Sequence, residues 1–249
     1  MKTYLLEIKY EFLKALRTPQ YSLPTIIFPT IFYYFFGVLY GGKKAGGVKM
    51  AEYLLATYGA FGVIAAAMFG FGVTVAVERG HGWLEAKRVT PMPIASYFVA
   101  KLVMAMLFSS IVVLILFTMG AFLANVTLPF VKAVTLFATL VSGAITFCAL
   151  GLAVAFYAGP SSAPAIVNVL YLPMAFVSGL WVPIQFLPPA VRDIAQWLPP
   201  YHYSQLALHV IGASRGQSVA YHAFAMLAAA LLFAAIAFHG YRRDVSQVH

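Results

Sequence analysis

The sequence predicts an all-α membrane protein with six transmembrane helices, an N-terminal interfacial amphipathic helix and a re-entrant helical hairpin before the last span. The prediction rests on the composition, on the length of the charge-free stretches and on where these are interrupted. Of the 249 residues, 62% are hydrophobic and 9% are charged, whereas ordinary soluble domains carry roughly 25% charged residues. A soluble fold so poor in charge would expose large apolar patches. We therefore expect lipid to cover most of the surface of one transmembrane domain, residues 1–249.

The spans are predicted from stretches that lack Asp, Glu, Lys and Arg. A helix needs roughly 20 mostly apolar residues to cross a bilayer. One of the five stretches is long enough for two spans and is broken by the turn signal GPSSAP at residues 159–164. The stretches are Thr18–Gly42, Tyr53–Val77, Leu102–Val131, Ala133–Val191 and Gly216–Tyr241.

The distribution of basic residues predicts the orientation. Six spans place both termini on one side, and ten Lys and Arg residues then flank the terminal side against six on the other. Basic residues are retained on the cytoplasmic side of membranes, so we expect both termini in the cytoplasm and the chain in the inner membrane. This retention also explains the net charge of +9 better than nucleic-acid binding does.

Residues 1–18 read as an amphipathic helix and not as a signal peptide, because acidic residues interrupt the apolar ones. Apolar and charged side chains recur at helical spacing on two different faces, which favours a helix lying in the membrane interface. A short cytosolic helix with a solvated charged face is the alternative. The apolar set is Leu5, Ile8, Phe12 and Leu16, and the charged set is Glu7, Glu11 and Lys14.

Prolines divide the region after the fifth span into pieces too short to cross a bilayer. We interpret residues 184–214 as a helical hairpin that dips into the outer leaflet and returns, although an ordinary outer loop remains an alternative. Irregular backbone at that depth requires cover by protein or a water-filled cavity.

Residues 78–93, between the second and third spans, form the richest polar segment. Gly80 and Gly82 let the chain turn out of the membrane, and Pro91 and Pro93 end the short helix that follows. Such a helix, with Trp83 and Leu84 available for contact, suits docking to a soluble partner. A solvated helix without a partner fits these residues equally well.

Few residues are of the kinds that perform catalysis. None of the seven acidic residues lies at the centre of a span, which argues against a transporter driven by a buried carboxylate. The histidines show no metal-ligand spacing, and there is no phosphate-binding loop. The single cysteine, Cys148, reads as a buried structural thiol. We therefore expect no catalytic residue, metal or cofactor in the chain, and energy supplied by a partner.

Two motifs resemble the permeases of the ABC-2 transporter family. The first, Glu78-Arg79-Gly80 followed by Glu85 and then KRVTP at residues 87–91, resembles their coupling-helix region. It departs from that pattern at Gly82-Trp83 and Ala86-Lys87. The second, SGLWVPIQFLP at residues 178–188 followed by WLPPYH at residues 197–202, resembles the segment after their fifth span. With Arg17-Thr18-Pro19 before the first span, the resemblance covers essentially the whole chain.

The resemblance implies a permease subunit of an ATP-driven exporter. Two permeases, identical or homologous, would each contact a separate ATPase subunit that binds ATP and Mg²⁺. The substrate would be a drug, lipid, polysaccharide or similar amphiphile. ATPase coupling would involve Glu78, Arg79, Trp83, Leu84, Glu85, Arg88, Thr90 and Pro91.

The resemblance also places the translocation path along spans one and five, and an outer gate in the hairpin. Aromatic and methionine-rich walls suit an apolar or amphiphilic substrate, although single aromatic residues in a span more often face lipid or the protein core. The path candidates are Phe32, Phe36, Asn168, Tyr171, Met174 and Ser178. The gate candidates are Trp181, Pro183, Pro188, Trp197 and Pro199.

Two other classes remain open. A lipid-modifying membrane enzyme would need a catalytic cluster, for which His202, His209, Arg192 and Asp193 are the candidates. A membrane scaffold or assembly factor, such as a cytochrome-maturation permease, would bind partners without ATP-dependent export.

Overall fold

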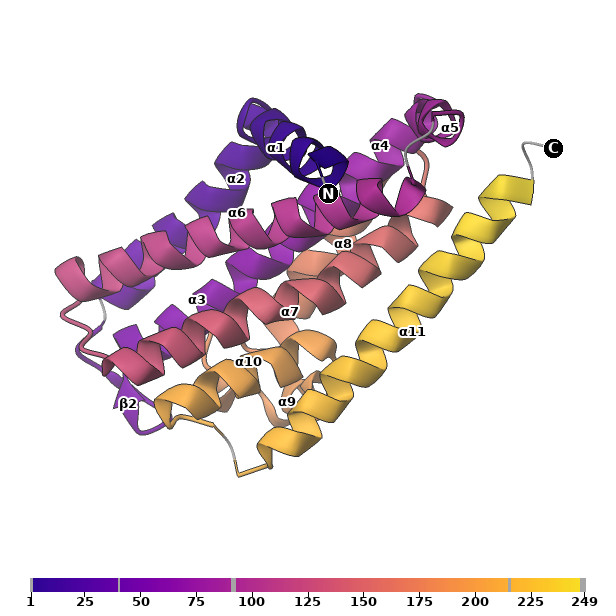
Figure 1. Ribbon diagram of the computed structural model, residues 1–249. Helices are drawn as coiled ribbons and strands as arrows, with labels where there is room; N and C mark the ends of the chain where they lie inside the picture. Colours follow the sequence, from indigo (N-terminus) through magenta and orange to yellow (C-terminus); the bar gives the residue numbers. More distant parts are fainter. Residues whose placement is uncertain (1, 40, 91–92, 215, 247–249) are drawn as a thin grey trace.

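The computed structural model describes residues 2–39, 41–90, 93–214 and 216–246, and within them the fold is a bundle of helices (Figure 1). The only strands in these ranges are β1 (Lys44–Ala45) and β2 (Val48–Lys49), which form a small antiparallel hairpin. The predicted all-α class is therefore confirmed. The described side chains exclude those of Lys2, Thr3, Gln20 and Arg88.

The helices follow one another with short connections. In chain order they are α1 (Lys2–Leu16), α2 (Pro19–Phe32), η1 (Tyr33–Val38), α3 (Met50–Ala67), η2 (Met68–Val73), α4 (Thr74–Gly80), α5 (Trp83–Arg88), α6 (Ile94–Leu123), α7 (Phe130–Tyr157), α8 (Ala163–Val177), η3 (Ile184–Phe186), α9 (Pro189–Ala195), α10 (Pro199–Ile211) and α11 (Val219–Ser246). The segments η1 and η2 are π-helical turns that continue α2 and α3 without a break.

Five helical segments in the described ranges are long and apolar enough to cross a membrane: Tyr21–Val38, Met50–Gly80, Ile94–Leu123, Phe130–Tyr157 and Val219–Ser246. The predicted fifth span corresponds to α8, which has 15 residues and contains Pro173. It is shorter than the roughly 20 residues that a bilayer requires, so α8 differs from the other five. The predicted break at residues 159–164 does separate α7 from α8.

The predicted third span was wrong at both ends. Helix α6 begins at Ile94 and ends at Leu123, whereas the charge-free stretch ran from residue 102 to residue 131. The rule that excluded every charge also excluded Lys101, which lies inside α6 and is fully buried. At the other end, the predicted stretch continued into Phe130 and Val131, which belong to α7.

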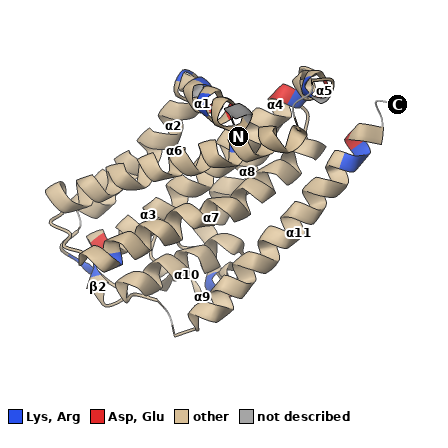
Figure 2. Cartoon of the chain, viewed as in Figure 1, with Lys and Arg blue, Asp and Glu red and all other residues tan. Residues whose placement is uncertain are grey.

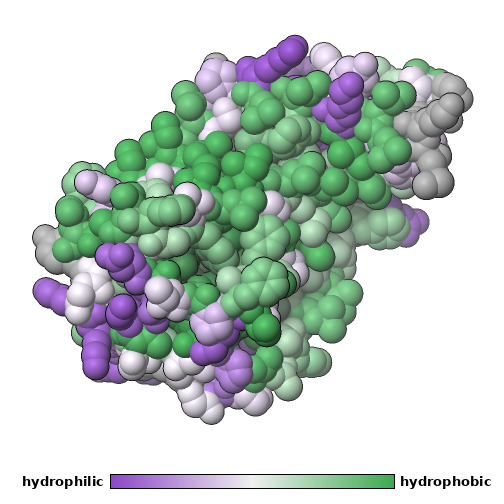
Figure 3. Space-filling view, turned by 60° about the vertical axis from the view of Figure 1, so that its left-hand side comes forward, coloured by the Kyte–Doolittle hydropathy of each residue, from purple (hydrophilic) through white to green (hydrophobic). Residues whose placement is uncertain are grey.

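Charged side chains gather at the two ends of the bundle and leave a long uncharged middle (Figure 2). We call one end the terminal end: it carries α1, α5, the start of α6 and the last turns of α11, with both chain termini (Figure 1). The other, the loop end, carries the β1–β2 hairpin and α9. Figure 3 shows the wide apolar surface between them, as expected of a protein embedded in lipid.

Helix α3 lies at the centre of the fold, with all but Met50 and Glu52 of its residues buried. Its continuation η2 approaches α7 so closely that a Cβ atom added at Gly72 would lie 2.6 Å from the Cα atom of Gly151. Small residues at such crossings let helix backbones meet in membranes. This contact fixes the position of α4, the segment that follows η2.

Residues 184–214 form η3, α9 and α10. Most of α10 is buried, and it packs against α3, α7 and α11. The Tyr203 hydroxyl donates a hydrogen bond to the Leu140 carbonyl at 2.5 Å, and its ring lies against Gly143. The chain therefore returns into the bundle here, although the depth of this pair in a bilayer stays a prediction.

Candidate functional site

Lys101 lies two turns into α6 and is 0% exposed. Its Nζ atom is 2.7 Å from Glu11 Oε2 of α1 and 2.7 Å from Glu78 Oε1 of α4. A buried ammonium group is tolerated only when it is paired and hydrogen-bonded. Lys101 therefore holds three segments together at one point.

Four more side chains extend this arrangement. The Tyr97 hydroxyl donates a hydrogen bond to Glu78 Oε2 at 2.5 Å, Lys14 forms an ion pair with Glu78, and Lys87 of α5 forms one with Glu7 of α1. We call the set the charged cluster; it consists of Glu7, Glu11, Lys14, Glu78, Lys87, Tyr97 and Lys101. Its three carboxylates balance its three ammonium groups, so the cluster can be buried without net charge.

The ring of Tyr97 lies close to the ammonium groups of two lysines in the charged cluster. Lys87 Nζ lies 4.9 Å from the ring centroid and Lys101 Nζ lies 5.3 Å from it, within the range of a cation–π contact. Lys14, at the exposed side of the cluster, is affected differently. Burial lowers its pKa, but the hydrogen bond and charge of Glu78, with Glu11 and Glu7, outweigh burial and raise that pKa above its ordinary value.

Helix α1 therefore presents its charged face to the protein. Glu11 is 8% exposed, whereas Leu5 is 65% and Leu16 is 44% exposed. The exposed apolar side chains suit a helix at a lipid interface. The alternative of a solvated charged face is wrong for Glu7 and Glu11.

Arg79 makes a second connection from α4. Its Nη1 atom donates to Asp244 Oδ1 of α11 at 2.8 Å, and its Nη2 atom donates to the carbonyl oxygen of Ala158, just after α7, at 2.9 Å. Glu78 and Arg79 thus face opposite partners. The two adjacent residues tie α4 to α1 and α6 on one side, and to α7 and α11 on the other.

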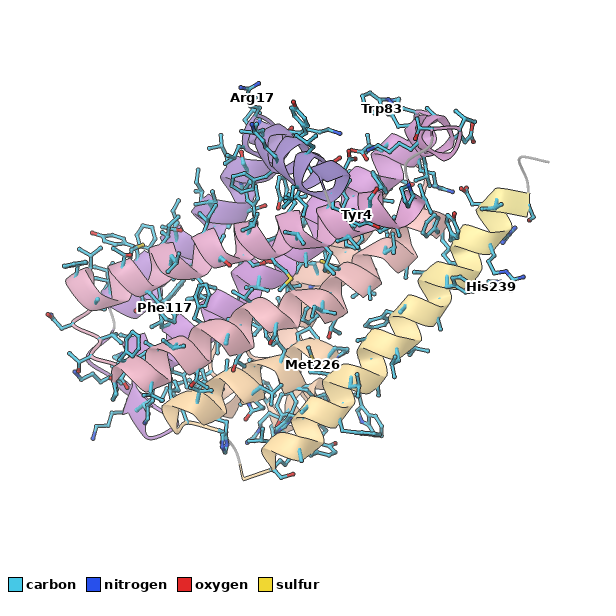
Figure 4. The ribbon with its side chains drawn as sticks, in the orientation of Figure 1. Tyr4, Arg17, Trp83, Phe117, Met226 and His239 are labelled. Atoms are coloured by element: carbon cyan, nitrogen blue, oxygen red, sulfur yellow. The ribbon has the colours of Figure 1, made fainter. Side chains whose placement is uncertain are left out.

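Helix α5 stands outside the bundle at the terminal end (Figure 4). Gly82 has a φ of +74°, a left-handed conformation that glycine adopts without steric cost, and it turns the chain into α5. Leu84 is 2% exposed, while Trp83 is 58% exposed and lies 5.3 Å from Lys14 Nζ. Glu85 is also exposed.

The residues predicted for ATPase coupling are thus divided. Glu78, Arg79 and Leu84 make contacts within the chain, so the expectation that Leu84 is available for contact was wrong. Trp83, Glu85 and Thr90 lie on the surface, and the Thr90 hydroxyl donates to the Lys87 carbonyl at 2.7 Å. The Arg88 side chain and Pro91 lie outside the described part of the structure.

Sequence reasoning missed Lys101, Glu11 and Tyr97. A signal for Lys101 was present, because a lysine that follows an apolar helix start is costly in a membrane and tends to be functional. The pairing of Lys101 with Glu11 and Glu78 could not be predicted, since these residues lie 90 and 23 positions away in the chain.

Three of the path candidates belong to an aromatic cluster between the end of α2, η1, α3 and α8. Phe32 stacks on Trp181 with ring centroids 5.5 Å apart and on Phe36 at 6.2 Å. Tyr171 stacks on Phe61 at 4.9 Å and donates a hydrogen bond to the Phe61 carbonyl. The structure therefore brings spans one and five together around α3.

The remaining path candidates differ in exposure. Asn168 is exposed, and its amide donates to the Pro164 carbonyl within α8. Met174 is partly buried and Ser178 is 1% exposed. The Ser178 hydroxyl has no hydrogen-bond partner among the described residues.

The gate candidates differ in exposure. Pro183 is buried and Trp181 is partly buried, with its carbonyl accepting a hydrogen bond from the Tyr58 hydroxyl at 3.1 Å. Trp197 is 87% exposed. Pro188 is exposed and Pro199 is partly buried.

The histidines considered for catalysis hold α10 in place. His202 Nε2 lies 2.9 Å from the Gln196 carbonyl, to which it must donate, so His202 Nδ1 accepts a hydrogen bond from His222 Nδ1 at 2.9 Å. His209 contacts Ser214. Within the described ranges, no group of three His, Cys, Asp or Glu residues is placed to hold a metal ion.

The helix bundle, with its apolar middle and its charged residues at the two ends (Figure 2), defines a multi-pass membrane protein. The sequence model of the family described as "ABC-2 type transporter" matches residues 4–212. The chain therefore belongs to the ABC-2 type transporter family. It is also similar to the "Putative transport permease YvfS" of Bacillus subtilis (strain 168), at 27% identity over 201 residues, 81% of this chain and 82% of that protein.

Proposed function

We propose that this permease is the membrane subunit of an ATP-driven exporter and that α5 docks in a groove of a separate ATPase subunit. One observation carries the proposal: α5 exposes Trp83 and Glu85, while Leu84 and Lys87 fix its other side to the bundle. A short helix that is exposed on one side and anchored on the other can transmit a push from a soluble partner. ATP and Mg²⁺ bind to that partner.

The charged cluster supplies the connection for such a push. Lys87 links α5 to α1, and Lys101 links α1 to α4 and α6. Arg79 continues the connection to α11 through Asp244. Displacement of α5 therefore acts on four helices at once.

The transported molecule passes, in this proposal, between two permease copies. Helix α2 and η1 expose a row of large apolar side chains, among them Phe28, Ile31, Phe35 and Phe36, and α8 exposes Val169 and Phe176. These faces flank the aromatic cluster that contains Phe32 and Tyr171. They suit contact with a second copy and an amphiphilic substrate such as a drug, lipid or polysaccharide, moved outward from the cytoplasmic side of the inner membrane.

The test is co-expression of the permease with the ATPase encoded nearest to it, followed by purification through a tag on the permease alone. ATP hydrolysis and the amount of co-purified ATPase are measured for wild type and for Trp83→Ala with Glu85→Ala. We expect the variant to lose most of the bound ATPase, because both side chains lie on the exposed side of α5. Asp193→Asn, exposed at the loop end, is the matched control and should bind as wild type does.

Equal binding by wild type and the α5 variant would contradict docking at α5. Failure of any ATPase to associate in nanodiscs would instead favour a membrane scaffold. Reconstitution of the purified complex, with ATP-dependent loss of a fluorescent amphiphile from the ATPase side, tests the outward direction.

A further inference from the structure

A groove opens between α6, α7 and α11 in the half of the bundle nearest the terminal end. Its cavity volume is about 500 Å³, within the range of about 300–1,000 Å³ that is common for ligand sites. The first turns of α6, the last turns of α7 and the end of α11 line it, and almost all of the lining atoms are apolar.

Small side chains create the hollow, and aromatic side chains line its terminal half. Ala95, Ala149 and Ala234 line the groove where larger side chains would fill it. At the terminal end, the rings of Phe98, Phe156 and Tyr241 contact one another, with centroids 5.6 to 6.5 Å apart. The groove is therefore an apolar slot that opens toward the lipid-facing surface, with three aromatic rings in its terminal half.

Water cannot occupy this slot favourably, because a bound water needs two to four polar partners and the lining offers almost none. The helices that form it are three of the five long enough to span a membrane, so the slot faces hydrocarbon. An acyl chain matches both the lining and the surroundings.

Basic residues beside the groove favour a lipid with an anionic headgroup. Arg242 is exposed, and its guanidinium lies 5.8 Å from the ring of Phe238, which itself lines the groove. Arg243 is also exposed, whereas Asp244 is held by Arg79. Basic residues at the membrane surface attract anionic lipids.

We propose that this groove binds one anionic phospholipid, with an acyl chain between α6 and α11 and the headgroup phosphate at Arg242. The site lies away from the aromatic cluster of α2, α3 and α8, and it does not depend on the ATPase or on the direction of transport. It requires only that the helices cross a bilayer. A bound lipid would connect α11 to α6, which the described contacts join mainly through α7.

The test uses the full chain in nanodiscs that contain a photoactivatable phosphatidylglycerol or a phosphatidylcholine with the same chains. Labelled peptides are mapped by mass spectrometry. The variants are Ala234→Phe, which fills the slot from the surface of α11, and Arg242→Gln. Matched controls are Ala235→Phe, the next residue on α11 and not part of the lining, and Arg17→Gln, exposed just after the end of α1. Size-exclusion profiles verify that each variant is folded.

We expect phosphatidylglycerol to label residues 94–102, 145–156 and 234–241 preferentially, and Ala234→Phe to remove most of that labelling. Arg242→Gln should weaken labelling by phosphatidylglycerol by about fivefold, the effect of one basic residue at a lipid surface, and leave labelling by phosphatidylcholine unchanged. Uniform labelling of all bilayer-facing helices, or equal labelling by both lipids, would overturn the proposal. So would a cross-link between two permease copies through these same peptides.

Discussion

At the scale of single residues, Lys101 of this permease joins α1, α4 and α6 through buried ion pairs. It is fully buried between Glu11 and Glu78, and removing one member of a buried pair leaves an uncompensated charge. The effect of replacing Lys101 on stability therefore comes from the loss of its ion pairs more than from the loss of its side-chain packing. The sequence shows the lysine but not the two carboxylates that it joins, because pairing across 90 residues is a property of the fold.

We expect Lys101→Met to lower the free energy of unfolding by about 3–5 kcal/mol, since Glu11 and Glu78 then lose a buried partner. Thermal unfolding in detergent measures the change. The same substitution at Lys132, exposed in the first turn of α7, should change stability by no more than about 0.5 kcal/mol. Similar losses for both variants would show that Lys101 is not held by its ion pairs.

The environment of His202 predicts that the stability of the protein falls at acidic pH. Burial lowers its pKa below the ordinary value of 6.5, and the hydrogen bond to the Gln196 carbonyl only partly offsets this. The unfolded chain then binds a proton more readily than the folded one, so stability is complete above pH 6.5 and falls as the pH drops through the lowered pKa. One such group changes stability by at most about 1.4 kcal/mol per pH unit.

Unfolding midpoints between pH 7.5 and 5 test this expectation. His202→Asn, which keeps an acceptor near Nδ1, should give a shallower decline than wild type. His209→Asn is the control, because His209 is exposed and contacts only Ser214 in the described hydrogen bonds. Parallel curves for wild type and His202→Asn would refute the assignment.

At the scale of elements, apolar length predicted the helices well and their ends poorly. Spans one, two and six were located because lipid requires long uncharged helices. The start of α6 was missed because its charge is neutralised inside the protein and not by water. The division of residues 78–93 into inward and outward side chains also could not be predicted, since the rotation of a six-residue helix depends on the Lys87–Glu7 ion pair.

The contact between η2 and α7 gives a prediction for one element. Gly72→Ala places a Cβ atom 2.6 Å from the Cα atom of Gly151, so the two backbones must separate. We expect a loss of about 1–3 kcal/mol, as for overpacking elsewhere. Gly42→Ala, where the added atom meets nothing within 4 Å, should be tolerated. Thermal unfolding of the two variants side by side decides, and equal stability would mean that the crossing adjusts freely.

At the scale of the whole molecule, the terminal end is held together by ion pairs between distant parts of the chain. Glu7, Glu11 and Lys14 join the first helix to the middle of the sequence, and Asp244 joins the last helix to Arg79. The all-α membrane class was predictable from composition because it depends on a sum over many residues. These links were not, because each depends on two particular residues meeting.

Breaking the Arg79–Asp244 pair should loosen the end of α11 without unfolding the bundle. Both side chains are partly exposed, at 21% and 19%, and such pairs contribute little to total stability. We expect Asp244→Asn to speed amide hydrogen exchange in residues 238–246 while leaving the unfolding midpoint nearly unchanged. Arg243→Gln is the control. Unchanged exchange in Asp244→Asn would show that packing against α7 alone holds this end.

The π-helical turn η2 has a consequence for α4. A π turn accommodates one residue more than an α turn, and one residue corresponds to about 100° of rotation and 1.5 Å of rise in an α-helix. If Met68–Val73 relaxed to α geometry, α4 would rotate about its axis and shift along it by one residue position. Glu78 would leave Lys101, and Arg79 would leave Asp244. The ion pairs on both sides of α4 therefore fix the rotation of this helix about its axis. The extra residue in η2 would allow that rotation to change by one residue position.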